Sequence, residues 1–196
     1  MRIVGGRFKG RALMAPPIGK KDGKGLRPTA DRVRESVFNI LAHGVEDFDI
    51  DGVTVLDVFC GTGALGLEAM SRGAGHGVFI DSDAGALALV RKNTGPLGLA
   101  REVTMLKLDA ARLAPPPRVA KAPALLAFLD PPYDQGLTVP ALLGLKDKGW
   151  LADGSVVVVE VAAKEAFEPP RGFQLLDERT YGAARVILLR YGKSAP

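Results

Sequence analysis

Short apolar runs alternate with helix-length segments from residue 53 to residue 161, and this alternation constrains the fold more than any other feature of the chain. Each run has the length of a buried strand and is far too short to cross a membrane. The expected strands are 53–59, 77–81, 103–108, 124–130 and 155–161, and the expected helices are 63–72, 83–94 and 138–147. Strands that alternate with helices form a parallel sheet, so the pattern predicts an α/β protein.

The sequence on either side of this alternation adds smaller elements. Extended stretches at 173–179 and 185–191 are expected to pair as an antiparallel hairpin. Residues 2–13 contain short extended pieces broken by glycine, which predicts a small β-hairpin with basic tips. Thr29 is the expected N-cap of a helix that ends at Gly44.

Basic residues are concentrated at the start of the chain. Residues 1–34 hold ten Lys/Arg and two Asp/Glu, whereas the remainder holds sixteen Lys/Arg and twenty Asp/Glu. This asymmetry predicts a polyanionic partner, although a basic tail that only improves solubility would show the same pattern. We therefore divide the chain into a basic extension, residues 1–25, and one α/β domain, residues 26–196.

Cys60 is the only cysteine in the chain. An intrachain disulfide and a cysteine cluster that binds zinc are therefore excluded. A single cysteine suits a reducing compartment, so we expect a cytoplasmic protein that binds no metal.

Four carboxylates end four successive strand-like runs: Asp57, Asp81, Asp109 and Asp130, at intervals of 24, 28 and 21 residues. Each interval corresponds to one βα unit. The carboxyl ends of parallel strands share one edge of a sheet, and ligands bind at that edge. Any one of these acids could be a polar strand terminator or a helix cap, but four in register favour a ligand site.

A glycine-rich turn at residues 61–66 follows the first of these strands, with Asp81 twenty residues after Gly61. Such a turn permits NAD, FAD or S-adenosyl-L-methionine. Asp57 would repel a pyrophosphate but attract a sulfonium and an ammonium group, which favours S-adenosyl-L-methionine. Asp81 is then placed to accept hydrogen bonds from ribose hydroxyls, and Asp109 from an adenine amino group.

The sequence Asp130-Pro131-Pro132-Tyr133 follows the run 124–129. The prolines keep the chain extended and offer carbonyl oxygens without N–H donors. Acceptors beside an aromatic ring suit a flat base with an exocyclic amine, which needs stacking and hydrogen bonds at its edge. This motif alone suits adenine, cytosine and guanine equally.

Residues 57–69 resemble motif I of class I methyltransferases, and residues 26–35 resemble an element upstream of it. Together with Ile3-Val4-Gly5-Gly6 and the Asp130 motif, they resemble the bacterial 16S rRNA (guanine-N2) methyltransferase family of the RsmD type. Two departures are Asp81, where the family usually has glutamate, and Cys60, where alanine is common. Asp81 still suits hydroxyl binding with a shorter reach, and Cys60 is expected to be a packing residue.

The resemblance implies a Rossmann-like class I methyltransferase fold: a mostly parallel seven-stranded sheet with an antiparallel C-terminal hairpin and a small N-terminal extension. It also implies methyl transfer from S-adenosyl-L-methionine to the N2 amine of a guanine in 16S rRNA or in an assembling small ribosomal subunit. A monomer is expected.

The candidate site residues form three groups. For catalysis, Asp130 and the Pro131 carbonyl are expected to accept the protons of the amine, while Tyr133 stacks on a base that has left its helix or loop. The cofactor is expected to contact Asp57, Phe59, Gly61, Thr62, Gly63, Asp81, Ser82, Asp109 and Ala110, with Thr29 and Arg32 near its methionine end. The RNA is expected to contact Arg2, Arg7, Lys9, Arg11, Arg27 and Arg34. The arginines between 27 and 34 are difficult to divide between the cofactor, the RNA and acids of the core.

Three other functions remain open. A DNA adenine-N6 or cytosine-N4 methyltransferase would carry a similar tetrapeptide but usually has a sizeable target-recognition region, for which this chain has little room. An NAD-dependent oxidoreductase is permitted by the glycine turn and disfavoured by Asp57. A noncatalytic RNA-binding factor for ribosome assembly would keep the fold, although the intact Asp130 motif argues against it.

Overall fold

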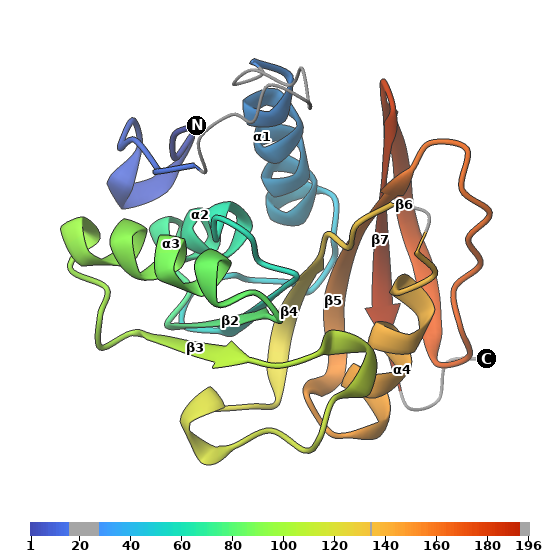
Figure 1. Ribbon diagram of the computed structural model, residues 1–196. Coiled ribbons are helices and arrows are strands. Elements are labelled where there is room, and N and C mark those ends of the chain that lie inside the picture. Colours follow the sequence, from blue (N-terminus) through green and yellow to red (C-terminus); the bar gives the residue numbers. More distant parts are fainter. Residues whose placement is uncertain (16–27, 134, 193–196) are drawn as a thin grey trace.

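The computed structural model describes residues 1–15, 28–133 and 135–192 and contains one seven-stranded sheet (Figure 1). The strand order is β3-β2-β1-β4-β5-β7-β6. Strands β1 to β5 are parallel, and β7 runs antiparallel between β5 and β6. The predicted α/β fold with an antiparallel C-terminal hairpin is confirmed.

The strands and helices predicted from residue 53 onward are present, with boundaries that differ by a few residues. The strands are β1 (Thr54–Val58), β2 (His76–Asp81), β3 (Val103–Lys107), β4 (Ala124–Leu129), β5 (Leu151–Ala162), β6 (Phe173–Tyr181) and β7 (Ala184–Tyr191). The helices are α1 (Pro28–His43), α2 (Ala64–Ser71), α3 (Ala84–Thr94) and α4 (Thr138–Asp147). The 3-10 turns are η1 (Gly6–Phe8), η2 (Gly95–Leu97), η3 (Ala110–Arg112) and η4 (Arg118–Ala120). The largest difference is the early start of β5, where Leu151 pairs with Ala124 ahead of a register shift.

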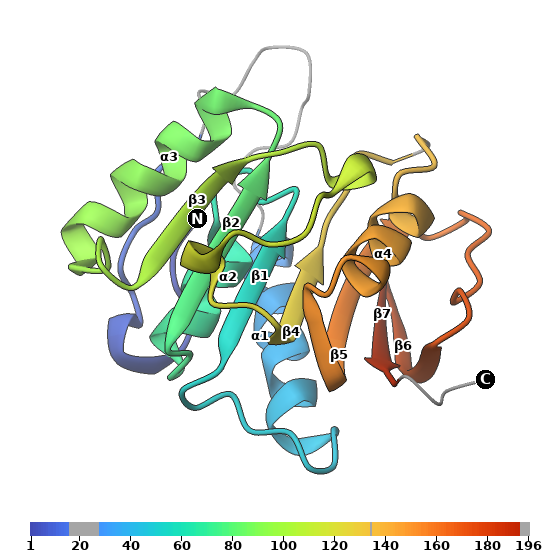
Figure 2. The ribbon, with the colours of Figure 1, turned by 90° about the horizontal axis from the view of Figure 1, so that it is seen from below.

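Successive strand residues point to opposite faces of the sheet, and different helices cover the two faces (Figures 1 and 2). Val55 and Phe128 belong to the core that the sheet forms with α1, α2 and α3. Leu56 and Ala127 belong to a second core, which the opposite face forms with α4, η3 and η4. The alternation of side chains therefore assigns each strand residue to one of two separate cores.

Residues 1–15 pack against the α1–α3 side of the sheet (Figure 1). Ile3 is fully buried and Leu13 is 6% exposed, so both belong to the core of the domain. The hairpin pairing expected here is limited to a single antiparallel bridge between Arg2 and Ala12. The segment is therefore held mainly by its packing on the domain, and the predicted boundary at residue 25 lies outside the described residues.

Helix α2 satisfies backbone groups of this segment that a longer hairpin would have paired. The N–H of Val4 donates to Glu68, and the N–H of Phe8 donates to the hydroxyl of Ser71. Ser71 in turn donates its hydroxyl proton to the carbonyl of Gly5 at 2.6 Å. These bonds favour a 3-10 turn at residues 6–8 over a regular hairpin tip.

Helix α1 begins at Pro28, so the prediction of Thr29 as its N-cap is wrong. Proline suits the first helical turn because its φ is already helical and its missing N–H would have no partner there. The helix ends at His43, ahead of Gly44, as the sequence predicted. Residues 16–27, with the expected linker and Arg27, lie outside the described residues, as do the side chains of residues 28–30.

Candidate active site

The four predicted carboxylates lie at one edge of the sheet. Asp57 is the penultimate residue of β1, Asp81 is the last residue of β2, and Asp130 directly follows β4. Asp109 comes two residues after the end of β3 and caps η3. Because these strands are parallel and adjacent, their carboxyl ends meet, as the spacing predicted.

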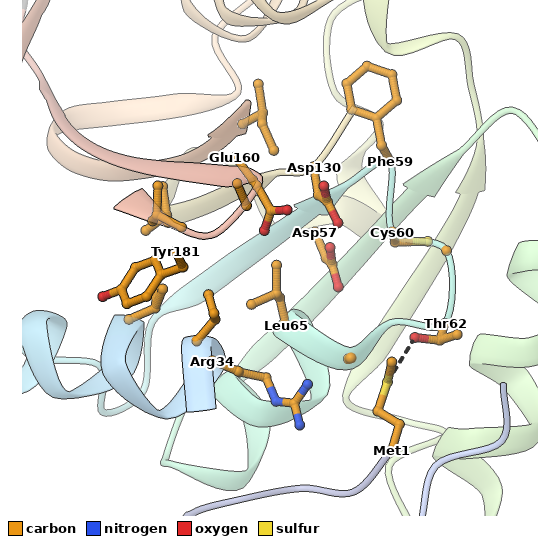
Figure 3. Close-up of a pocket in the computed structure, with 18 of the residues that line it drawn as sticks. Met1, Arg34, Asp57, Phe59, Cys60, Thr62, Leu65, Asp130, Glu160 and Tyr181 are labelled. Carbon is orange, nitrogen blue, oxygen red and sulfur yellow. Dashed lines mark hydrogen bonds between the residues drawn. The ribbon is translucent and has the colours of Figure 1, made fainter. Parts of the chain in front are cut away.

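A cavity of about 320 Å³ opens beside this edge, on the face of the sheet that α1 and α2 cover (Figure 3). Its wall combines the turn after β1 with the ends of β4, β5 and β7 and with one side of α1. The lining includes Met1, Val33, Arg34, Asp57, Phe59, Gly61, Thr62, Leu65, Asp130, Tyr133, Val158, Glu160, Tyr181 and Val186. We call this cavity the central pocket.

The alternation of side chains along the strands brings three carboxylates into the central pocket. Asp57 lies two residues beyond Val55, which belongs to the α1–α3 core, and therefore projects to the same face. The same alternation carries Asp130 and Glu160 to that face. Figure 3 shows the three carboxylates in the same cavity.

Asp57 is 2% exposed, and one of its oxygens accepts the N–H of Gly66 at 2.8 Å. Burial raises the pKa of Asp57 to about 8, the Gly66 bond opposes the rise, and the charges of Asp130 and Asp81 add to it. A cation in the pocket would favour the ionised carboxylate. Asp57 is therefore suited to a positively charged ligand.

The turn between β1 and α2 has a backbone that brings main-chain atoms to the pocket. Phe59 has φ 60°, Gly61 has φ 51° and Gly63 has φ 76°. A Cβ on Gly61 would meet nothing within 4 Å, so a side chain would fit here. Glycine is favoured at this position because of its positive φ. At Gly63 a Cβ would lie 3.0 Å from Val90 and 3.1 Å from Phe79, so this glycine also permits close packing.

Asp81 connects this turn to the end of β2. Its carboxylate accepts the N–H of Gly61 at 3.0 Å and the N–H of Asp83 at 2.9 Å. Asp81 and Ser82 do not line the central pocket, and neither do Gly63, Asp109 and Ala110. The exposed Asp109 accepts the N–H of Ala111 at 2.9 Å. The predicted cofactor residues therefore occupy two neighbouring places, the pocket and the β2–β3 part of the same edge.

Tyr133 and Glu160 form a hydrogen-bonded pair that the sequence did not predict. The phenol of Tyr133 donates to Oε1 of Glu160 at 2.6 Å. Burial, the bond to Glu160 and nearby carboxylates raise the pKa of Tyr133, so the phenol remains protonated at neutral pH. Glu160 was missed because it belongs to no motif, although it is an acid within the apolar run expected to form the fifth strand.

Arg34 is 4% exposed, so its position gives little support to the predicted contact with RNA. Its guanidinium donates to Asp31 at 2.9 Å and to the carbonyl of Arg2, and it lies 3.5 Å from the fully buried Glu68. The same Glu68 pairs with Arg72 at 2.8 Å. Arg34 therefore connects α1 to α2 and to the N-terminal segment, while its edge forms part of the pocket wall.

The other predicted basic residues in the described ranges are exposed. Arg2, Arg7, Lys9 and Arg11 lie at the surface of the N-terminal segment. Two of them have acidic neighbours, since Arg7 is 2.8 Å from Glu102 and Arg2 is 3.6 Å from Asp31. Arg32 is also exposed and does not line the central pocket, so its position gives no support to a cofactor role.

Membrane spans and metal clusters are both absent from the described ranges of the chain. No helix there is long and apolar enough to cross a membrane. In the same ranges, no group of three or more His, Cys, Asp or Glu side chains could hold a metal ion.

Sequence and structure comparisons agree with this arrangement. A family model described as conserved hypothetical protein 95 matches residues 1–190. "Ribosomal RNA small subunit methyltransferase D" of Escherichia coli K12 is 37% identical over 185 residues, covering 93% of this chain and 85% of that protein. The Haemophilus influenzae protein of the same name is 31% identical over 187 residues, covering 93% and 89%.

A solved structure resembles the whole chain. "Putative methyltransferase yhhF" from Escherichia coli superposes with a TM-score of 0.77 at 34% sequence identity and covers 98% of both chains. The fold is thus that of a methyltransferase. Because the family model spans nearly the whole chain and these relatives share about a third of its residues, the chain belongs to the conserved hypothetical protein 95 family, that of ribosomal RNA small subunit methyltransferase D.

Proposed function

We propose that this methyltransferase transfers a methyl group from S-adenosyl-L-methionine to the exocyclic N2 amine of a guanine in 16S ribosomal RNA. The observation that carries the proposal is the meeting of Asp57 and Asp130 in one pocket. Asp57 suits the positive charge of a methyl donor, and Asp130 suits the amine that receives the methyl group. The rRNA substrate is supported by the names of the relatives.

The residues of the chain fit this cofactor. Asp57 offers a buried acceptor that a cation would stabilise, and the backbone of Phe59, Gly61 and Thr62 borders the same cavity. At the end of β2, Asp81 and Ser82 are the proposed contacts for ribose hydroxyls, and Asp109 with Ala110 are the proposed contacts for the adenine. When bound, S-adenosyl-L-methionine supplies an electrophilic methyl carbon on a sulfonium.

The protein must make a weakly nucleophilic amine reactive. The lone pair of guanine N2 is delocalised into the ring, and hydrogen bonds from its two protons to Asp130 and the Pro131 carbonyl favour a pyramidal nitrogen. With the cofactor bound, the nitrogen would form its bond to the methyl carbon as the carbon–sulfur bond breaks, and Asp130 would accept the proton that the amine then loses. The contribution of the protein is position and electrostatics.

Tyr133 is expected to lie against the base, but its hydroxyl is already engaged by Glu160. The ring is therefore held in place by that bond instead of being free to rotate over the base. Arg2, Arg7, Lys9 and Arg11 supply the exposed positive surface for RNA phosphates, and Arg27 remains a proposed contact. An rRNA substrate also agrees with the expected cytoplasmic location of the protein.

Labelled-methyl transfer tests the proposal. Naked 16S rRNA and small subunits from a strain lacking this protein are incubated with the enzyme and labelled S-adenosyl-L-methionine, and the modified base is mapped. The expected product is one N2-methylguanine in 16S rRNA. Label in DNA alone would support the adenine-N6 or cytosine-N4 alternative. RNA binding without label in any nucleic acid would support the noncatalytic assembly factor.

A further inference from the structure

Glu160 lies in β5, and the proposed catalytic Asp130 directly follows the adjacent strand β4. Strands β4 and β5 are parallel, and Leu129 pairs with Val159. Asp130 and Glu160 are the next residues after this pair. Paired positions of parallel strands lie about 4.8 Å apart and project to the same face. The two carboxylates are therefore lateral neighbours at the wall of the central pocket, as Figure 3 shows.

Glu160 is held in this position by its surroundings. Its Oε1 accepts the phenol proton of Tyr133 at 2.6 Å, and Glu160 pairs through its backbone with Val186 of β7. A carboxylate has about four lone-pair sites, so one such bond leaves it able to accept others. The apolar side chains of Val158 and Val186 line the same wall, where each hydrogen bond has a larger effect than it would have in water.

The bases that carry an exocyclic amine differ in the ring atom beside that amine. Adenine N6 is next to N1, and cytosine N4 is next to N3; both ring nitrogens are acceptors. Guanine N2 is next to N1–H, which is a donor. Two neighbouring carboxylates therefore match the two neighbouring donors of guanine and repel the acceptor lone pairs of adenine and cytosine.

We propose that Glu160 is the residue that selects guanine, by accepting the N1–H of the base while Asp130 accepts a proton of the N2 amine. The proposal rests on the proposed function and assigns to one side chain the choice of base that the Asp130 motif leaves open. A base without the N1 donor leaves Glu160 facing a lone pair. Loss of such a bond in a closed site lowers the rate by about 10- to 100-fold.

The test combines Glu160→Gln with a change of one base. The substrate is a 16S rRNA fragment, or a reconstituted subunit, in which the mapped guanine is replaced by 2-aminopurine. This base keeps the 2-amine but has an acceptor at N1. For the unmodified enzyme, kcat/KM should be at least about 10-fold lower on 2-aminopurine than on guanine. In Glu160→Gln, the ratio of kcat/KM on guanine to kcat/KM on 2-aminopurine should fall about 10-fold or more, because the glutamine amide can donate to N1.

Tyr133→Phe is the matched control, since it removes the hydrogen bond to Glu160 but keeps the carboxylate. Its activity is expected to fall on both bases with the preference for guanine retained. An equal preference in Glu160→Gln and the unmodified enzyme would overturn the proposal. A loss of the preference in Tyr133→Phe as large as that in Glu160→Gln would also overturn the assignment to the carboxylate alone, because the hydrogen bond from Tyr133 would then be required as well.

Binding of S-adenosyl-L-methionine provides a further decisive measurement. Glu160→Gln should bind the cofactor with unchanged affinity, because Glu160 is assigned to the base. A loss of cofactor affinity that parallels the loss of methyl transfer would move Glu160 to the cofactor site and overturn the assignment. Failure of the unmodified enzyme to methylate guanine would instead refute the proposed function itself.

Discussion

Arg34 and Glu68 form an ion pair inside the protein, with 3.5 Å between Nε and a carboxylate oxygen and side-chain exposures of 5% and 0%. The pair joins α1 to α2, and each partner also contacts the N-terminal segment: Arg34 donates to the carbonyl of Arg2, and Glu68 accepts the N–H of Val4. A charge buried this deeply depends on its partners, because water cannot replace them.

Arg34→Met is therefore expected to lower the free energy of unfolding by about 3 kcal/mol, since Glu68 would remain buried with fewer partners. Urea denaturation measures the change. Arg179→Met is the control, because the Arg179 side chain is 59% exposed in its pair with Asp177, and it should cost less than about 1 kcal/mol. Equal stability of the two variants would show that the buried pair contributes little.

The affinity for S-adenosyl-L-methionine should increase with pH. The pKa of Asp57 is raised to about 8 in the free protein, so the group is largely protonated at pH 6, and a bound cation favours its ionised form. Binding thus releases a proton below pH 8, and the affinity rises by up to about tenfold per pH unit before it levels off. Isothermal titration calorimetry at pH 6, 7, 8 and 9 measures this. In Asp57→Asn the affinity should be weak and nearly independent of pH.

The same group makes the free protein less stable at alkaline pH. The folded-state pKa of Asp57 lies above its ordinary value of 3.8, so its favourable contribution is complete below about pH 4 and is lost as the pH rises through about 8. Asp57→Asn removes this contribution. The melting temperature of the variant should therefore fall less between pH 6 and pH 9 than that of the unmodified protein, in both cases without cofactor. An identical pH dependence would exclude Asp57 as the cause.

Asp130→Ala should separate cofactor binding from methyl transfer. Asp130 is assigned to the amine, so the increase in melting temperature on adding S-adenosyl-L-methionine should persist, while turnover falls by about 100-fold or more. Thermal shift and labelled-methyl transfer on the same preparation give the two values. Unchanged turnover would remove Asp130 from the catalytic group.

RNA affinity should depend on exposed charges of the N-terminal segment. Deleting the segment would confuse binding with folding, because Ile3 and Leu13 belong to the core. Lys9→Gln with Arg11→Gln avoids this problem. The variant should bind RNA more weakly. The plot of log affinity against log salt should also become less steep, by about 0.7 to 0.9 for each phosphate that the protein no longer neutralises. Lys148→Gln, which follows α4 on the other side of the sheet, should change neither value.

Local sequence patterns predicted the sheet and most of the carboxylate edge, because both depend on strand period and on the spacing of βα units. Asp57, Asp81, Asp109 and Asp130 needed no knowledge of packing. The burial of Arg34 could have been predicted as well. It shares a stripe of α1 with Val37, Phe38 and Leu41, and an arginine on such a stripe needs an acidic partner.

The remaining contacts depend on tertiary structure. That Glu68 is the partner of Arg34, and that Tyr133 bonds to Glu160, follows from how α2 and β5 are placed and not from any local pattern. The extent of backbone pairing within residues 2–13 was also overestimated. Short extended pieces around glycine do not show whether backbone groups will bond to each other or to α2.

The wall of the central pocket is assembled from segments spread along the chain, from Met1 to Val186 in β7. No continuous stretch of the sequence contains the whole wall, so the cavity exists only when the sheet is complete. Ligand capture can therefore serve as a reporter of correct folding: in a library of random variants, retention on an immobilised cofactor analogue should enrich chains with an intact sheet, whether or not they remain active.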